Sequence, residues 1–72
     1  EAEKICRKMI MIEPEVPRHY YNLIFVLEKE HKYDEAFECI KNNKNILTNK
    51  NIVNELKKKL RASKRKYEKL IK

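Results

Sequence analysis

The sequence has no glycine and no tryptophan, and it has only two prolines and two cysteines in 72 residues. Without glycine, tight hairpin turns are hard to form, because they need backbone at positive φ. No apolar run approaches the ~20 residues that a membrane-spanning helix requires. A single pair of cysteines gives little support for a disulfide framework, which also needs an oxidising compartment. We therefore expect helices joined by short polar turns, no membrane span, and an intracellular location, cytoplasmic or nuclear.

The composition is that of one small globular domain with a charged surface. Apolar residues make up 42% of the chain and charged residues 40%, and the net charge is +7. Residues 1–47 hold 8 Lys and Arg against 9 Asp and Glu, whereas residues 48–72 hold 10 against 2. We therefore expect a near-neutral unit at residues 1–47 and a strongly basic helix at residues 48–72. The chain does not begin with Met, and we expect it to begin inside a longer protein or at a processed end.

Apolar residues recur at steps of three and four in the first half of the chain, which predicts two amphipathic helices. The first covers Ala2–Ile12 and ends before Pro14, because proline cannot donate the backbone hydrogen bond of a continuing helix. The second begins near Pro17, a residue suited to a first turn. Its main apolar stripe consists of Tyr20, Leu23, Ile24 and Leu27.

A third helix is predicted to start near Tyr33 and to bury Ala36, Phe37, Cys39 and Ile40. Asparagines are poor helix formers, so we expect a break between Asn42 and Thr48. A fourth helix then runs from about Lys50 almost to the end, with three candidate caps: Thr48, Asn49 and Asn51.

The fourth helix carries a heptad-like stripe with one polar position. The stripe residues are spaced alternately by three and four: Val53, Leu56, Leu60, Ser63, Tyr67 and Leu70. The other faces of this helix are rich in lysine and arginine. The sequence thus predicts an all-α chain with a long, basic and amphipathic C-terminal helix.

The chain also contains an internal repeat. Glu-Ala occurs at residues 1–2 and again at residues 35–36, an offset of 34, and in this register Ala2 matches Ala36 and Ile5 matches Cys39. A helix pair with a period of 34 is typical of tetratricopeptide repeats. The segment YYNLIFVLEKEHKYDEAFECI, from Tyr20, resembles such a repeat, with Ala36 as the small close-packing residue and His31 where the family has a turn glycine.

The resemblance covers residues 1–47, as the second helix of one repeat followed by one complete repeat. It implies antiparallel helix hairpins of an α-solenoid, whose concave wall is formed by first helices and binds extended peptides or partner helices. A related family, the pentatricopeptide repeats, reads single-stranded RNA and is the alternative. Its period of 35 fits less well, and Pro14 comes too early for it.

If the chain is a tetratricopeptide module, the resemblance implies a partner-binding surface on the second helix. Tyr21 and Phe25, one turn apart, would form an apolar shelf with charged residues at its rim. The alternative is that both aromatic rings pack against a helix that this chain lacks. Asn22 also matches an asparagine of the clamp that holds chaperone C-termini, but the next helix offers Ile52 and Leu56 where the clamp needs cations. The candidate partner-binding residues are Arg18, Tyr21, Asn22, Phe25 and Lys29.

The basic helix has three interpretations. In the first, it caps the solenoid, and its far half lies in solvent or continues a longer helix. In the second, its apolar stripe pairs with another helix, either from a second copy of the chain or from a different protein. In the third, its cations contact RNA phosphates or an acidic membrane surface. The candidate cations are Lys57, Lys58, Lys59, Arg61, Lys64, Arg65 and Lys66.

No constellation for catalysis is present, because the sequence shows no nucleophile–base pair, no glycine-rich phosphate loop and no paired carboxylates. His19 and His31 have no partners at metal-ligand spacing, so we expect surface or turn residues, no metal and no cofactor. The sequence therefore favours a non-enzymatic scaffold that binds a peptide or helix of another protein. The alternative is an RNA-associated helical-repeat protein that uses its basic helix for phosphate contacts.

Overall fold

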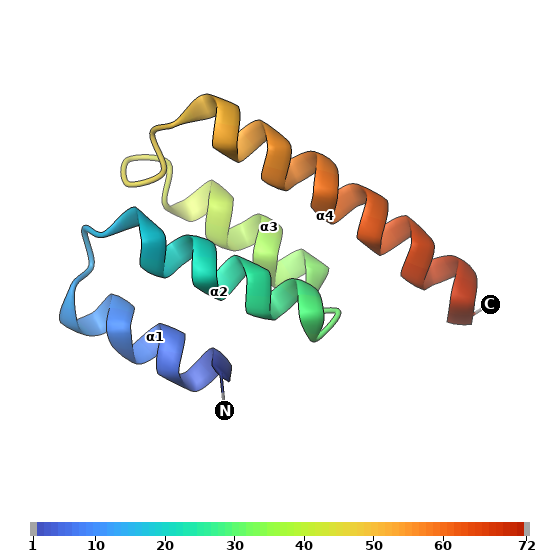
Figure 1. The fold of residues 1–72 in the computed structure, drawn as a ribbon, viewed down its shortest axis with the longest axis horizontal. Helices are drawn as coiled ribbons and strands as arrows, with labels where there is room; N and C mark the ends of the chain where they lie inside the picture. Colours follow the sequence, from blue (N-terminus) through green and yellow to red (C-terminus); the bar gives the residue numbers. More distant parts are fainter. Residues whose placement is uncertain (1, 72) are drawn as a thin grey trace.

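The computed structural model describes residues 2–71, which form four α-helices and no strand (Figure 1). The helices are α1 (Ala2–Ile12), α2 (Pro17–Lys29), α3 (Tyr33–Asn42) and α4 (Lys50–Ile71). Each helix packs against the next one along the chain, and successive helices run in opposite directions. These bounds confirm the all-α prediction and the predicted break after α3. None of the helices in this part of the chain is both long and apolar enough to cross a lipid bilayer.

The turn after α2 contains a residue in the left-handed conformation, although the chain has no glycine to place there. The N–H of Lys32 donates to the carbonyl of Leu27 (2.8 Å), and the N–H of His31 donates to that of Glu28 (3.1 Å). This pair of bonds is a Schellman motif, which needs one residue in the left-handed conformation and usually takes glycine there. His31 occupies this position with a φ of 61°. The prediction that His31 is a turn residue is confirmed.

The last helix begins at an asparagine cap. The side-chain Oδ1 of Asn49 accepts a hydrogen bond from the N–H of Ile52 (3.2 Å). This bond satisfies a backbone donor that the first turn of a helix otherwise leaves unpaired. Of the three predicted candidates, Asn49 is therefore the residue that caps α4.

The core lies where α2, α3 and α4 meet. Ala36 is completely buried, and its small side chain lets α3 approach α2 closely. Leu60 is only 1% exposed, so α4 shares this core rather than forming a separate one. Phe37 and Cys39, predicted to be buried, are half-buried against it. The buried apolar residues are Tyr20, Leu23, Ile24, Leu27, Tyr33, Ala36, Ile40, Leu47 and Leu60.

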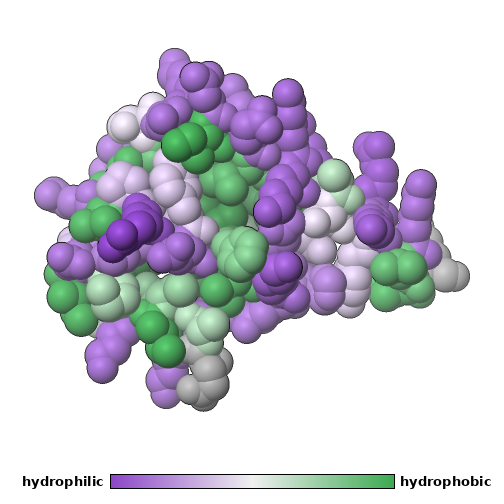
Figure 2. Space-filling model, viewed as in Figure 1, coloured by the Kyte–Doolittle hydropathy of each residue, from purple (hydrophilic) through white to green (hydrophobic). Residues whose placement is uncertain are grey.

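The first helix buries only part of its apolar stripe. Cys6 and Ile10 pack against the core, whereas Ile5 and Ile12 are 62% and 64% exposed. Figure 2 shows the hydrophobic side chains that gather over α1, in contrast to the mostly hydrophilic cover of α4. The apolar stripe of α1 is thus wider than the surface of α2 and α3 against which it packs.

The loop between α1 and α2 corrects the prediction for His19, which is buried rather than on the surface. Its Nε2 lies 2.9 Å from a carboxylate oxygen of Glu13, and the neighbouring Tyr20 hydroxyl donates to the carbonyl of Pro14 (2.6 Å). Both bonds draw the loop back over the first turn of α2. His19 is buried because this loop covers it, which helix periodicity alone does not reveal.

The start of α1 is tied to the α2–α3 turn through Glu3. The ammonium of Lys32 donates to one carboxylate oxygen of Glu3 (2.8 Å) and the guanidinium of Arg7 to the other (3.0 Å). These two hydrogen bonds lower the pKa of Glu3 from 4.5 to about 2, and the bond to Glu3 also raises the pKa of Lys32.

Because the pKa of Glu3 is lower in the folded state, its ion pairs stabilise the fold above pH 4.5, and this contribution is lost as the pH falls toward 2. We expect Glu3→Gln to flatten the pH dependence of the free energy of unfolding across that window, measured by urea denaturation. Glu15→Gln is the control, since Glu15 is exposed and forms no ion pair within residues 2–71. An unchanged slope in Glu3→Gln would contradict this role.

Candidate functional site

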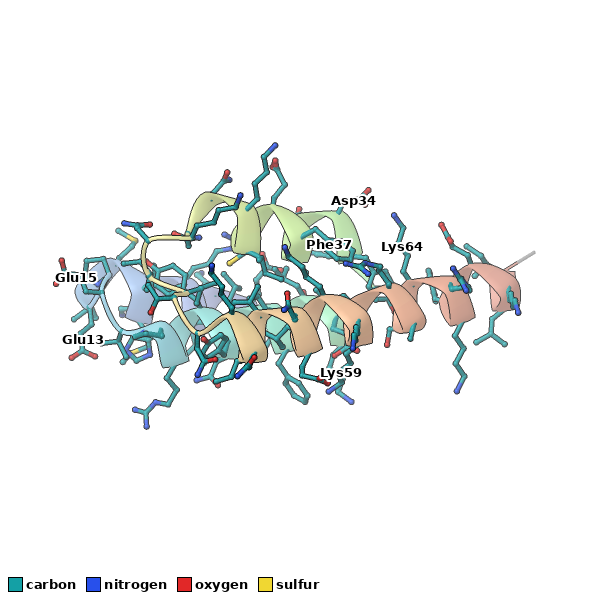
Figure 3. All side chains as sticks on the ribbon, turned by 90° about the horizontal axis from the view of Figure 1, so that it is seen from above. Glu13, Glu15, Asp34, Phe37, Lys59 and Lys64 are labelled. Atoms are coloured by element: carbon teal, nitrogen blue, oxygen red, sulfur yellow. The ribbon has the colours of Figure 1, made fainter. Side chains whose placement is uncertain are left out.

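Two helices form one side of the molecule and carry the predicted binding residues. Figure 3 shows α3 on one side and α2 and α4 together on the other, and Figure 1 shows that α2 and α4 run in the same direction. The α2–α4 face is defined here by Arg18, Tyr21, Asn22, Phe25 and Lys29 of α2 and by Lys59 of α4. Glu28 joins the two helices, because it accepts a hydrogen bond from the Ser63 hydroxyl (2.7 Å) and lies 3.8 Å from Lys59 Nζ.

Phe25 is the exposed aromatic ring of this face, with 49% of its surface accessible. The ammonium of Lys29 lies 5.2 Å from its ring centroid and that of Lys59 lies 5.5 Å away. A cation at this distance is attracted to the negative face of the ring. Two helices therefore hold an apolar surface between two positive charges.

The other predicted residues of the face differ in burial. Tyr21 is half-buried and packs against the core, so it does not form an open shelf with Phe25. Arg18, Asn22 and Lys29 are exposed. The structure thus places all five predicted residues on one helix, but it leaves Phe25 as the accessible apolar contact.

The sequence does not place Lys59 on this face, beside Phe25 and Glu28. It predicts Lys59 as one of the cations of the basic helix, in contact with phosphates or an acidic partner. One residue in the sequence did indicate a polar contact between α4 and its neighbours: Ser63 is the polar residue within the apolar stripe of α4. A half-buried hydroxyl needs a hydrogen-bond partner. In the structure that partner is the carboxylate of Glu28 in α2.

The seven predicted cations of α4 do not form one surface. Lys64 lies 3.1 Å from Asp34 of α3, whereas Lys59 lies beside Glu28 of α2. Figure 3 shows these two lysines pointing to opposite sides of α4. The other five form no ion pair within residues 2–71: Lys57, Lys58, Arg61, Arg65 and Lys66.

The stripe of α4 faces its own chain as far as Tyr67. The Tyr67 ring stacks on the His31 ring, with centroids 3.9 Å apart and planes 9° apart, and His31 Nδ1 lies 3.1 Å from the Tyr33 hydroxyl. Leu70 and Ile71 beyond it are 77% and 65% exposed. The far half of α4 is therefore anchored up to Tyr67 rather than projecting from Leu60 onward. Pairing of the α4 stripe with another helix stays a prediction, and Leu70 is the stripe residue that is exposed for it.

Both cysteines pack against the core. Cys6 and Cys39 are free and half-buried, and burial raises the pKa of the Cys39 thiol, so it is protonated at neutral pH. In the described part of the chain, no three His, Cys, Asp or Glu side chains are close enough to hold a metal ion.

Comparison with protein-family models, with curated proteins and with solved structures found no match for this chain. The resemblance to tetratricopeptide repeats therefore stays an interpretation of the sequence.

The left-handed backbone of His31 gives a direct test of the turn between α2 and α3. His31→Gly and His31→Ala both remove the stack with Tyr67, but only glycine adopts positive φ without strain. We expect the glycine variant to be more stable than the alanine variant by about 1 kcal/mol in urea denaturation. If the alanine variant is as stable as the glycine variant, or more stable, this turn does not require the left-handed conformation.

Proposed function

We propose that this chain is a non-enzymatic scaffold module that binds a peptide or helix of a partner protein on the α2–α4 face. The observation that carries the proposal is Phe25, half-exposed between the ammonium groups of Lys29 and Lys59. Interfaces concentrate their energy in aromatic anchors that the partner desolvates. An aromatic ring held by two helices is already positioned for this role before the partner arrives.

The charges around Phe25 favour a partner segment that combines an apolar side chain with carboxylates. Arg18, Lys29 and Lys59 are all positive, and within residues 2–71 only Lys59 forms an ion pair, at 3.8 Å from Glu28. Glu28, whose side chain is 11% exposed, neutralises only one of these three cations, so the face keeps a net positive charge. An acidic partner would be attracted to this face, and an apolar residue of that partner would cover the Phe25 ring.

The finer architecture that we propose is a tetratricopeptide-like α-solenoid fragment, with α4 as its basic capping helix. Three features of the fold support it: neighbouring helices pack in sequence, Ala36 is completely buried between helices, and His31 takes a positive φ where the family has glycine. In this scheme α2 and α4 hold the places of first helices, which form the concave wall. The free, half-buried cysteines suit the reducing cytoplasm or nucleus.

A second candidate function is RNA association through α4. Lys58, Arg61, Arg65 and Lys66 are exposed and form no ion pair within residues 2–71. Such cations bind phosphates with a strong dependence on salt and with little sequence specificity.

A peptide-display selection against the wild-type chain supplies ligands, and fluorescence polarisation measures their affinity. We expect the selected peptides to carry both acidic and apolar residues. Phe25→Ala should weaken their binding about tenfold or more, because it removes the anchor of the face. Met11→Ala is the matched control, since it removes an apolar side chain that is 82% exposed on α1, and it should change the affinity by less than about twofold.

Equal affinity for the Phe25→Ala and Met11→Ala variants would contradict the proposed face. The RNA candidate would replace it if single-stranded RNA binds more tightly than any selected peptide. In that case added salt should weaken binding steeply, and Lys58→Ala combined with Arg61→Ala and Arg65→Ala should remove it.

A further inference from the structure

A groove lies on the other side of α4, between α3, the loop that follows it and the first half of α4. Its volume is about 530 Å³. Ile40 and Leu47 form its buried apolar floor, and the half-buried Val53 completes it from α4. This volume falls within the range of roughly 300–1,000 Å³ that is typical of ligand pockets. The groove has room for side chains of a bound segment above an apolar base.

The rim of the groove carries one sign of charge. Lys44, Lys50 and Lys57 line it together with uncharged polar residues, and no acidic residue is among the lining side chains. None of the three lysines forms an ion pair with a carboxylate in residues 2–71. The first turn of α4, at the edge of the groove, also lacks an acidic residue, so the positive end of its helix dipole is not neutralised by one there. An anionic ligand would therefore be attracted by lysines of α4 and of the loop before it.

From this combination of apolar floor and cationic rim, we infer that the groove binds an acidic peptide segment of a partner protein through one apolar side chain. The apolar side chain covers Val53 and the floor, while the carboxylates of the segment approach the three lysines. A nucleic acid is a poorer fit, because no aromatic ring lines the groove to stack on a base.

The position of the groove makes it independent of the α2–α4 face. It is formed with α3, on the side of α4 where Lys64 meets Asp34, whereas Phe25 and Lys59 lie on the side of α2. Figure 3 shows Lys59 and Lys64 pointing in opposite directions. A scaffold with both surfaces occupied would hold two segments at once, one on each side of α4.

The probe for this site is a short fluorescein-labelled peptide rich in glutamate with a single central leucine. Its affinity for the chain is measured by fluorescence polarisation, and amide chemical shifts locate the bound peptide. We expect shifts at Leu47 and Val53. Two matched peptides separate the contributions: glutamate replaced by glutamine should remove the attraction, and leucine replaced by serine should remove the anchor.

Lys44→Glu combined with Lys50→Glu tests the rim, because both side chains are exposed and their reversal leaves the core intact. This variant should weaken the leucine-containing peptide about tenfold or more. Lys4→Glu combined with Lys8→Glu is the control, since it makes the same change of net charge on exposed residues of α1. It should change the affinity by less than about twofold.

Three results would overturn the inference: equal effects of the two double variants, absence of shifts at Leu47 and Val53, or equal binding of the serine-containing peptide. Displacement of the bound peptide from these residues by single-stranded RNA at lower concentration than by unlabelled peptide would also overturn it, in favour of nucleic acid. The same peptide can also bind the α2–α4 face, so the amide shifts at Leu47 and Val53 report on the groove alone. These shifts should persist in the Phe25→Ala variant, and their loss there would overturn the inference.

Discussion

The burial of Leu60 among the side chains of α2 and α3 is the interaction on which the rest of the structure depends. Burying one leucine side chain stabilises a fold by roughly 1.5–3 kcal/mol, and Leu60 is 1% exposed. With α4 held there, Lys59 reaches the Phe25 ring, Ser63 reaches Glu28, and Tyr67 stacks on His31. Each of these contacts joins α4 to a different part of α2 or of the turn that follows it.

Docking of α4 also determines how the positive charge of the chain is distributed. Lys59 and Lys64 lie beside carboxylates of α2 and α3, on opposite sides of the helix. α4 therefore contributes lysines to two surfaces, with Lys59 beside Phe25 on the α2–α4 face and Lys50 and Lys57 at the groove above Leu47. The positive charge of this basic helix is divided between these surfaces.

Much of the fold could be predicted from the sequence, because its signals are local. Pro17 starts α2, the asparagines after Ile40 end α3, and the apolar stripe of α2 is buried as its spacing indicates. The errors and omissions involve contacts between segments. Burial of His19 depends on the path of a loop, and the placing of Lys59 beside Phe25 depends on the angle at which α4 crosses α2. Neither the path nor the angle is encoded in the periodicity of one helix.

Native-state hydrogen exchange tests most directly whether α4 and the helical hairpin form one folding unit. If they do, the amides around Leu60 in α4 should exchange with the same free energy of opening as those around Leu27 in α2. The last turn of α4, beyond Tyr67, should exchange faster, because its apolar residues are exposed. Rapid exchange throughout α4, with α2 and α3 still protected, would contradict the shared core and with it both proposed binding surfaces.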